Sequence, residues 1–163
     1  MKLNWKRQLL FNKVQFFKNN KLVGRMGYHS LWKSAKIEFD DNKYEIQSFK
    51  TLFVNSGEFY ASEPKRILAR FKFNSLKRTG TIKSDGKEYN LKLINFWGTK
   101  WKLTDDNQSI IKLSNSFYKG NIEAETEDIP LVLLSYYMSK QKHIVVYAFI
   151  LIYLVFTVYQ AFK

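Results

Sequence analysis

The chain has 163 residues, 45% of them hydrophobic, with 4 Trp, 10 Tyr and 14 Phe, and its formal net charge is +13. This composition fills the core of one domain and excludes an intrinsically disordered chain, while the absence of cysteine excludes disulfides and thiolate metal sites. Residues 1–80 carry 17 Lys and Arg against 6 Asp and Glu, which favours anionic partners. The alternative is that these cations only keep the surface solvated.

Polar clusters divide the chain at intervals of 21 or 22 residues. They are Asn19-Asn20, Asp40-Asp41-Asn42, Ser62-Glu63-Pro64, Ser84-Asp85-Gly86 and Asp105-Asp106-Asn107. Asn and Asp tolerate the left-handed backbone conformation and Gly adopts it without steric cost, so each cluster is predicted to be the tip of a β-hairpin. We therefore expect about 10–12 short strands within residues 1–127.

Between the tips, apolar and polar residues alternate, as in Lys36-Ile37-Glu38-Phe39 and Tyr89-Asn90-Leu91-Lys92-Leu93. Alternation of this kind indicates strands with one buried and one solvated face. No helical periodicity interrupts the strands, which favours an antiparallel sandwich or barrel over a parallel α/β sheet. The predicted fold class is mainly β, with the strands meandering around an antiparallel barrel.

An acidic stretch leads into an apolar helix predicted for residues 128–140. Asp128 is the expected N-cap and Pro130 fits the first turn, where helices accept proline. Residues 141–163 follow as a third region, in which 144–162 contain no ionisable group except tyrosine.

The apolar segment 144–162 is interpreted as a transmembrane helix, because its 19 residues would span about 28 Å. Its membrane-facing residues are predicted to include Ile144, Phe149, Ile152, Leu154 and Phe156. Lys140 and Lys142 outweigh Lys163, which predicts a tail anchor with the β domain in the cytoplasm. The competing interpretation is a helix enclosed in the protein core.

Three short strings resemble the tubby/phospholipid scramblase/LURP-one superfamily. They are Lys21-Leu22-Val23-Gly24-Arg25, Lys33-Ser34-Ala35-Lys36-Ile37 and Asp128-Ile129-Pro130-Leu131. The resemblance covers residues 8 to about 140 and implies an antiparallel barrel of about twelve strands closed around a hydrophobic helix. Residues 129–139 would then be the central plug, although either apolar segment could take that place. The resemblance also implies non-catalytic roles, chiefly binding of anionic phosphoinositide headgroups and membrane association.

Cations on two adjacent predicted strands form the candidate site for an anionic ligand. They are Lys65, Arg66, Arg70, Lys72, Lys77 and Arg78. The alternative is that alternating cations simply cover the outer barrel wall.

Residues suited to catalysis or metal binding are scarce. His29 and His143 share no ligand spacing, and the paired aspartates fall in predicted hairpin tips. No glycine-rich phosphate loop is present in the sequence. The sequence therefore predicts no enzyme activity, no cofactor and no metal.

These features predict a membrane-associated binding or scaffolding module whose partners are anionic membrane lipids. A membrane protein that packs against the C-terminal helix is a further candidate partner. The alternative is a soluble, cytoplasmic tubby-like domain that buries its C-terminal helix in the barrel and binds nucleic acid or an acidic protein through its basic face. Nucleic acid is the less favoured partner, because aromatics at alternating strand positions usually belong to the core.

Overall fold

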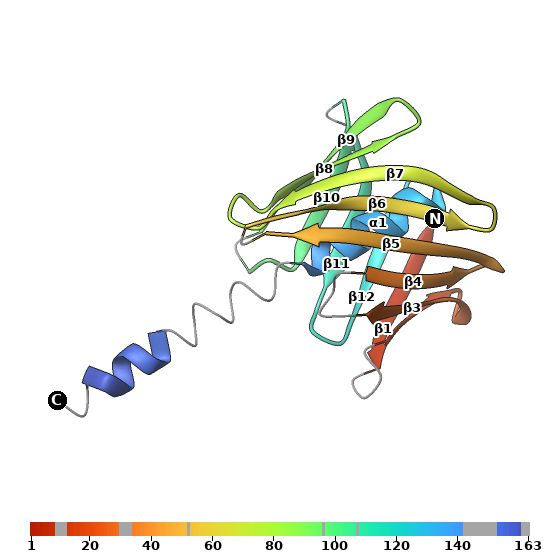
Figure 1. Cartoon of the computed structure of the whole chain (residues 1–163). Helices are drawn as coiled ribbons and strands as arrows, with labels where there is room; N and C mark the ends of the chain where they lie inside the picture. The colour runs from red at the N-terminus through yellow and green to blue at the C-terminus, as the bar shows by residue number, and fades with distance from the viewer. Residues whose placement is uncertain are drawn as a thin grey trace.

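The computed structural model describes residues 1–8, 13–29, 34–51, 53–95, 97–106, 108–141 and 153–160. Twelve antiparallel strands follow one another around a closed barrel, and the last strand pairs with the first (Figure 1). The strands are β1 (Lys2–Gln8), β2 (Lys13–Lys18), β3 (Lys21–His29), β4 (Ser34–Phe39), β5 (Asn42–Lys50), β6 (Val54–Ser62), β7 (Lys65–Asn74), β8 (Thr79–Ser84), β9 (Lys87–Leu93), β10 (Lys100–Asp105), β11 (Gln108–Asn115) and β12 (Lys119–Ala124). The predicted antiparallel barrel is confirmed.

Short polar turns join the strands at one end of the barrel, which we call the turn end. Asn19, Asn20, Asp40 and Asp41 have φ values of 50°, 63°, 45° and 63°. Two successive residues with positive φ form the turn that matches the right-handed twist of a hairpin, which explains the choice of Asn and Asp here. Gly86, with φ of 77°, serves the same purpose between β8 and β9. The predicted hairpin tips are therefore confirmed.

The opposite end is where odd-numbered strands end and even-numbered strands begin, and we call it the loop end. Longer connections join β5 to β6, β7 to β8, β9 to β10 and β11 to β12 there. Because every neighbouring pair of strands is antiparallel, the two ends are on opposite sides of the barrel. Each residue can therefore be placed along the barrel axis from its position in its strand.

The barrel wall buries every second side chain, as the alternation in the sequence predicts. Phe16, Ile46, Phe59 and Leu91 have no exposed surface, while their neighbours along each strand are more open to solvent. The inward side chains of all twelve strands meet around the barrel axis and leave room there for one further element.

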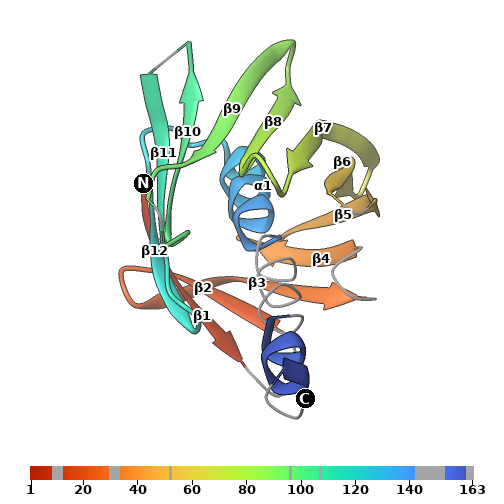
Figure 2. The same ribbon diagram turned by 90° about the vertical axis from the view of Figure 1, so that its left-hand side faces the viewer.

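The helix α1 (Ile129–Lys140) fills the centre of the barrel, and the strands surround it in Figure 2. The Asp128 carboxylate caps its first turn by accepting a hydrogen bond from the Leu131 amide at 3.0 Å. All residues from 131 to 140 are buried, which a helix that is apolar on every face requires. The prediction of a central plug is confirmed, and it is the earlier of the two apolar segments that occupies this place.

Aromatic side chains join α1 to the wall. The Tyr136 ring lies 5.2 Å from the Trp5 ring and 5.1 Å from the Phe16 ring, measured between centroids, and the Tyr137 ring lies 5.8 Å from the Phe71 ring. Such pairs add about 0.5–1.5 kcal/mol each beyond the burial of apolar area. The plug therefore contributes strongly to the stability of the barrel.

The helix runs from the turn end to the loop end. Asp128 and Pro130 line a cavity together with Ser84 and Asp85 of the β8–β9 turn, and near the other end of α1 the Asn115 side chain donates to the Ser139 hydroxyl at 2.9 Å. Since Asn115 is the last residue of β11, the final turn of α1 lies at the loop end.

Residues 153–160 form a second short helix with exposed side chains. Among the described residues, no helix combines the length and the apolar character needed to cross a bilayer. The predicted transmembrane helix covers 144–162, of which 144–152 and 161–162, including Ile144, Phe149 and Ile152, are outside the described residues. Leu154 and Phe156 belong to the short helix and are exposed.

Candidate functional site

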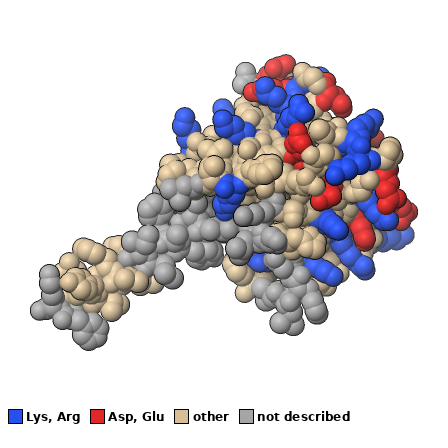
Figure 3. Space-filling model, in the orientation of Figure 1, with Lys and Arg blue, Asp and Glu red and all other residues tan. Residues whose placement is uncertain are grey.

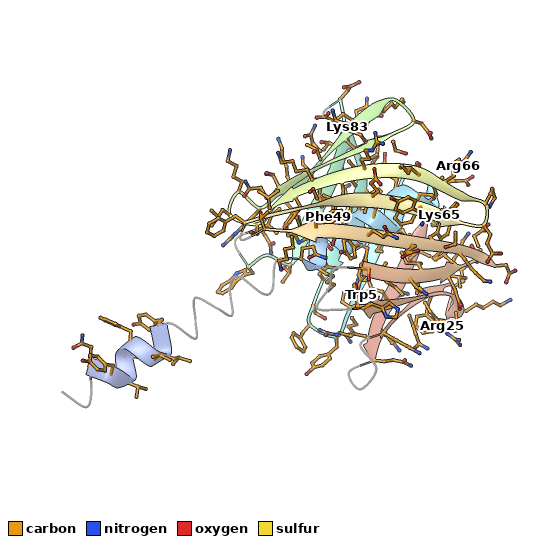
Figure 4. The ribbon with its side chains drawn as sticks, viewed as in Figure 1. Trp5, Arg25, Phe49, Lys65, Arg66 and Lys83 are labelled. Carbon is orange, nitrogen blue, oxygen red and sulfur yellow. The ribbon has the colours of Figure 1, made fainter. Side chains whose placement is uncertain are left out.

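The six cations predicted to form one anionic-ligand site are spread along the barrel. Lys65 and Arg66 begin β7 at the turn end, on the right of Figure 4, and Lys77 and Arg78 follow β7 at the loop end. The ten residues of β7 separate them by about 30 Å. The expectation that all six stand on two adjacent strands was wrong for Lys77 and Arg78, because they belong to the β7–β8 connection.

The two remaining members of that set lie between these pairs. Arg70 forms an ion pair with Glu58, with its Nε 2.9 Å from a carboxylate oxygen, and Tyr60 donates a hydrogen bond to the same carboxylate. These two hydrogen bonds lower the pKa of Glu58. Lys72 is exposed farther along the strand. The six cations therefore do not converge on one ligand.

The two ends of the barrel differ more in their acidic residues than in their cations. All 14 Asp and Glu fall within residues 38–45, 58–63, 85–88, 105–106 and 123–128. These ranges adjoin the turns of the turn end or the end of β12. The intervening ranges, which include the described loop-end connections, contain no acid. In Figure 3 the acidic side chains gather on the right and at the top of this face.

Cations gather at the loop end, where the described connections contain no acid. They include Lys6, Lys13, Lys50, Lys77, Lys100 and Lys119. The turn end, in contrast, mixes both signs, with ion pairs between Lys83 and Glu88 and between Lys87 and Asp105. The loop end therefore presents a positive field, which attracts anionic surfaces over about one Debye length.

Three lysines stand opposite one another on adjacent strands of the outer wall. Lys102 of β10 pairs with Lys92 of β9 on one side and with Lys112 of β11 on the other. Like charges that face each other across strands destabilise a sheet. Within the described part of the chain none of the three forms an ion pair, although Lys112 also stands opposite Glu123 of β12. An external anion would relieve the repulsion between Lys92 and Lys102.

Lys140 is a cation inside the loop end of the barrel. Its Nζ lies 3.7 Å from the centroid of the Trp5 ring and donates to the Ser116 carbonyl at 3.3 Å. Burial, with a smaller effect of Arg7, lowers the pKa of Lys140 to about 7. The sequence interpretation had counted Lys140 among the charges that flank a membrane span, whereas the structure places it in the core.

The barrel interior contains tyrosine hydroxyls rather than an acid–base pair. Burial raises the pKa values of Tyr28, Tyr136 and Tyr137, so these hydroxyls stay protonated at neutral pH. Tyr137 shares a hydrogen bond of 3.0 Å with Ser48. His29 is the last residue of β3, and His143 is outside the described residues. The described residues contain no group of acids and histidines that could hold a metal ion.

No protein family, curated protein or solved structure matches this chain. The barrel around a helix is the architecture that the tubby-like resemblance implies, but membership of that superfamily stays a prediction.

Sequence reasoning missed the segregation of acids, although a signal for it was present. Ten of the 14 acids lie in or near a polar tip, within 38–45, 58–63, 85–88 and 105–106, and the other four precede α1 in 123–128. Because strands of a meander alternate in direction, such periodic placement puts these ten acids at or towards the same end of the barrel. The candidate functional site is therefore the acid-free, cationic loop end.

Proposed function

We propose that this chain is a non-catalytic, membrane-associated binding module that recognises anionic phospholipid headgroups with the loop end of its barrel. The observation that carries the proposal is that the described connections of this end contain no acid, while Lys77, Lys100 and Lys119 there are all exposed. Cations near an anionic leaflet contribute about 1 kcal/mol each to binding. The apolar segment 144–162 supports the same proposal, since it follows α1 in the sequence and would hold the barrel to that membrane.

The test compares two triple variants of the full chain with equal net charge. Lys77→Glu, Lys100→Glu and Lys119→Glu reverse cations at the loop end, and the control reverses Lys18, Lys21 and Lys65 at the turn end. Binding is measured by flotation with vesicles of phosphatidylcholine, with and without phosphatidylserine, at low and physiological salt.

We expect the loop-end variant to lose about 100-fold in affinity for phosphatidylserine vesicles, from about 1 kcal/mol for each of three cations. The control should keep most of its affinity, and added salt should weaken wild-type binding. Equal losses in both variants would contradict the proposal, because net charge alone would then explain the attraction.

The lysine row on the outer wall supports a second candidate function, the binding of a linear polyanion such as nucleic acid through the basic face. Lys92, Lys102 and Lys112 follow one another across three strands and could contact successive phosphates. Fluorescence anisotropy with a labelled single-stranded RNA tests this candidate. Lys92→Glu with Lys112→Glu should abolish binding if it is correct, and the absence of binding by the wild-type chain would eliminate it.

A further inference from the structure

Large apolar side chains stand exposed around the loop end, and we call them the apolar crown. They are Phe49, Phe53, Leu76, Ile94, Trp97, Phe117 and Tyr118. Phe49 is 80% exposed and Trp97 is 82% exposed. They come from the end of β5 and from the β5–β6, β7–β8, β9–β10 and β11–β12 connections, so the crown follows the described part of the loop end from β5 to β12.

The rest of the described barrel surface has few such residues. Leu22 and Ile67 are its exposed large apolar side chains, and both belong to strands near the turn end. No turn of the turn end contains one. Exposed apolar side chains that cluster in one region mark an interaction surface, whereas scattered ones need no explanation.

Polar side chains hold the crown in place from beneath. The Asn95 side chain accepts hydrogen bonds from the Thr99 amide at 3.0 Å and the Lys100 amide at 2.8 Å. Gly98, with φ of 74°, completes this β9–β10 loop, which carries Trp97 outward. The polar groups of the loop bond to its own backbone while its apolar groups face the solvent. This fixed arrangement reduces the entropy that binding would otherwise cost.

A second contact joins two neighbouring loops of the crown. The Ser75 amide and hydroxyl both donate to the Phe53 carbonyl, at 2.8 Å and 3.0 Å. Phe53 and Leu76 are therefore presented together rather than on independent loops.

We propose that the apolar crown inserts into the interfacial region of an anionic bilayer, an inference that rests on the proposed function and adds penetration to headgroup attraction. The positive charge around the crown favours an anionic bilayer over a second copy of the chain as the occupant. Lys50, Lys77 and Lys100 stand among the crown residues, so a second copy placed crown to crown would bring these cations together. An anionic bilayer accepts apolar groups and neutralises the cations at the same time.

The continuation of the chain points to the same occupant. Helix α1 ends at the loop end with Gln141 as its C-cap, and the sequence then enters the apolar segment 144–162. Trp97 and Tyr118 are residue types that favour the boundary between hydrocarbon and water. Insertion of the crown would turn the loop end towards the bilayer, with Asp40 and Asp105 of the turn end farthest from the anionic lipids.

Quenching of Trp97 by lipids with brominated acyl chains tests insertion in the full chain. Trp5 and Trp101 are buried in the barrel, and a Trp97→Phe variant isolates the Trp97 contribution by difference. We expect vesicles that contain phosphatidylserine to quench this contribution and to shift its emission to the blue. Phe49→Ser with Phe117→Ser should remove both effects, whereas Leu22→Ser with Ile67→Ser, the matched control at the turn end, should leave them unchanged.

Flotation of the same samples separates the two proposals. A chain that floats with the vesicles while Trp97 stays unquenched would overturn crown insertion and leave headgroup recognition standing. A chain that does not float would overturn both. If the Phe49 and Phe117 substitutions instead convert an oligomer into a monomer in lipid-free solution without any quenching, the crown is a contact between copies and the proposal fails.

Discussion

The two ends of the barrel are built from the same strands, but they differ in the properties that a partner would recognise. The turn end joins its strands through tight polar tips such as Asn19-Asn20, and its acids and cations form ion pairs. The loop end has no acid in its described connections and exposes Phe49 and Trp97. Since the turn end shows that polar tips suffice to close a hairpin, folding alone does not require apolar residues at the loop end. Their presence there favours a role in binding.

The largest expected loss of stability from one substitution comes from Gly120, which allows the wall of the loop end to pack closely. A Cβ at this position would lie 2.0 Å from the Ser114 carbonyl oxygen and 2.7 Å from the Trp5 indole nitrogen. We expect Gly120→Ala to lower the free energy of unfolding by about 3 kcal/mol, because backbone must move to accommodate the methyl group. Gly27→Ala is the matched control, since a Cβ there meets nothing within 4 Å. Urea denaturation measures both, and equal stabilities would contradict this explanation.

Because of Lys140, the stability of the fold should increase as the pH rises. A surface lysine with a carboxylate partner would have the opposite effect. The pKa of Lys140 is about 7 in the folded chain against 10.5 for an ordinary lysine, so between these values the unfolded chain binds more protons. Stability should therefore rise from pH 7 towards pH 10, by up to about 1.4 kcal/mol per pH unit.

The substitution Lys140→Met isolates this effect. The variant should lose the rise between pH 7 and pH 10 and be more stable than wild type near pH 7, because no buried cation remains. Lys119→Met, at an exposed position of the same end, should keep the wild-type slope. Unfolding curves at several pH values decide the question, and an unchanged slope in Lys140→Met would show that another group titrates.

At the turn end, the cap of the plug should give a smaller effect. Asp128→Ala removes the carboxylate that accepts from the Leu131 amide, which should lower stability by about 1 kcal/mol. Asp128→Asn retains an acceptor and should recover most of that loss. Thermal unfolding measures the series, and equal losses for both substitutions would mean that the negative charge of Asp128 matters more than its hydrogen bond.

The fold was largely predictable because its determinants are local. The apolar and polar side chains that alternate along β4 and β9 show which face of each strand is buried. The positive φ values of Asp40 and Asp41 depend on the turn alone. The sequence also predicted an apolar plug, since a helix that is apolar on every face is either enclosed in a core or spans a membrane, but it did not determine which of the two apolar segments fills the barrel.

The candidate site was not predictable in the same way. Lys65 and Lys77 are close in sequence, but a ten-residue strand carries them to opposite ends of the barrel. The crown joins Phe49, Leu76 and Trp97 through strand direction, which no single stretch of sequence displays. Burial of Lys140 against Trp5 depends on how far α1 extends into the barrel, which the pattern of the helix alone does not determine.

The central claim is that the loop end faces an anionic membrane while the turn end faces water. Because the chain has no cysteine, single cysteines can be introduced at Leu76 of the loop end and at Asp85 of the turn end and spin-labelled in the full chain. In phosphatidylserine-containing vesicles, the label at position 76 should be accessible to oxygen dissolved in lipid and protected from a water-soluble nickel reagent. The label at position 85 should show the opposite pattern. Equal exposure of both labels to the nickel reagent would contradict the account.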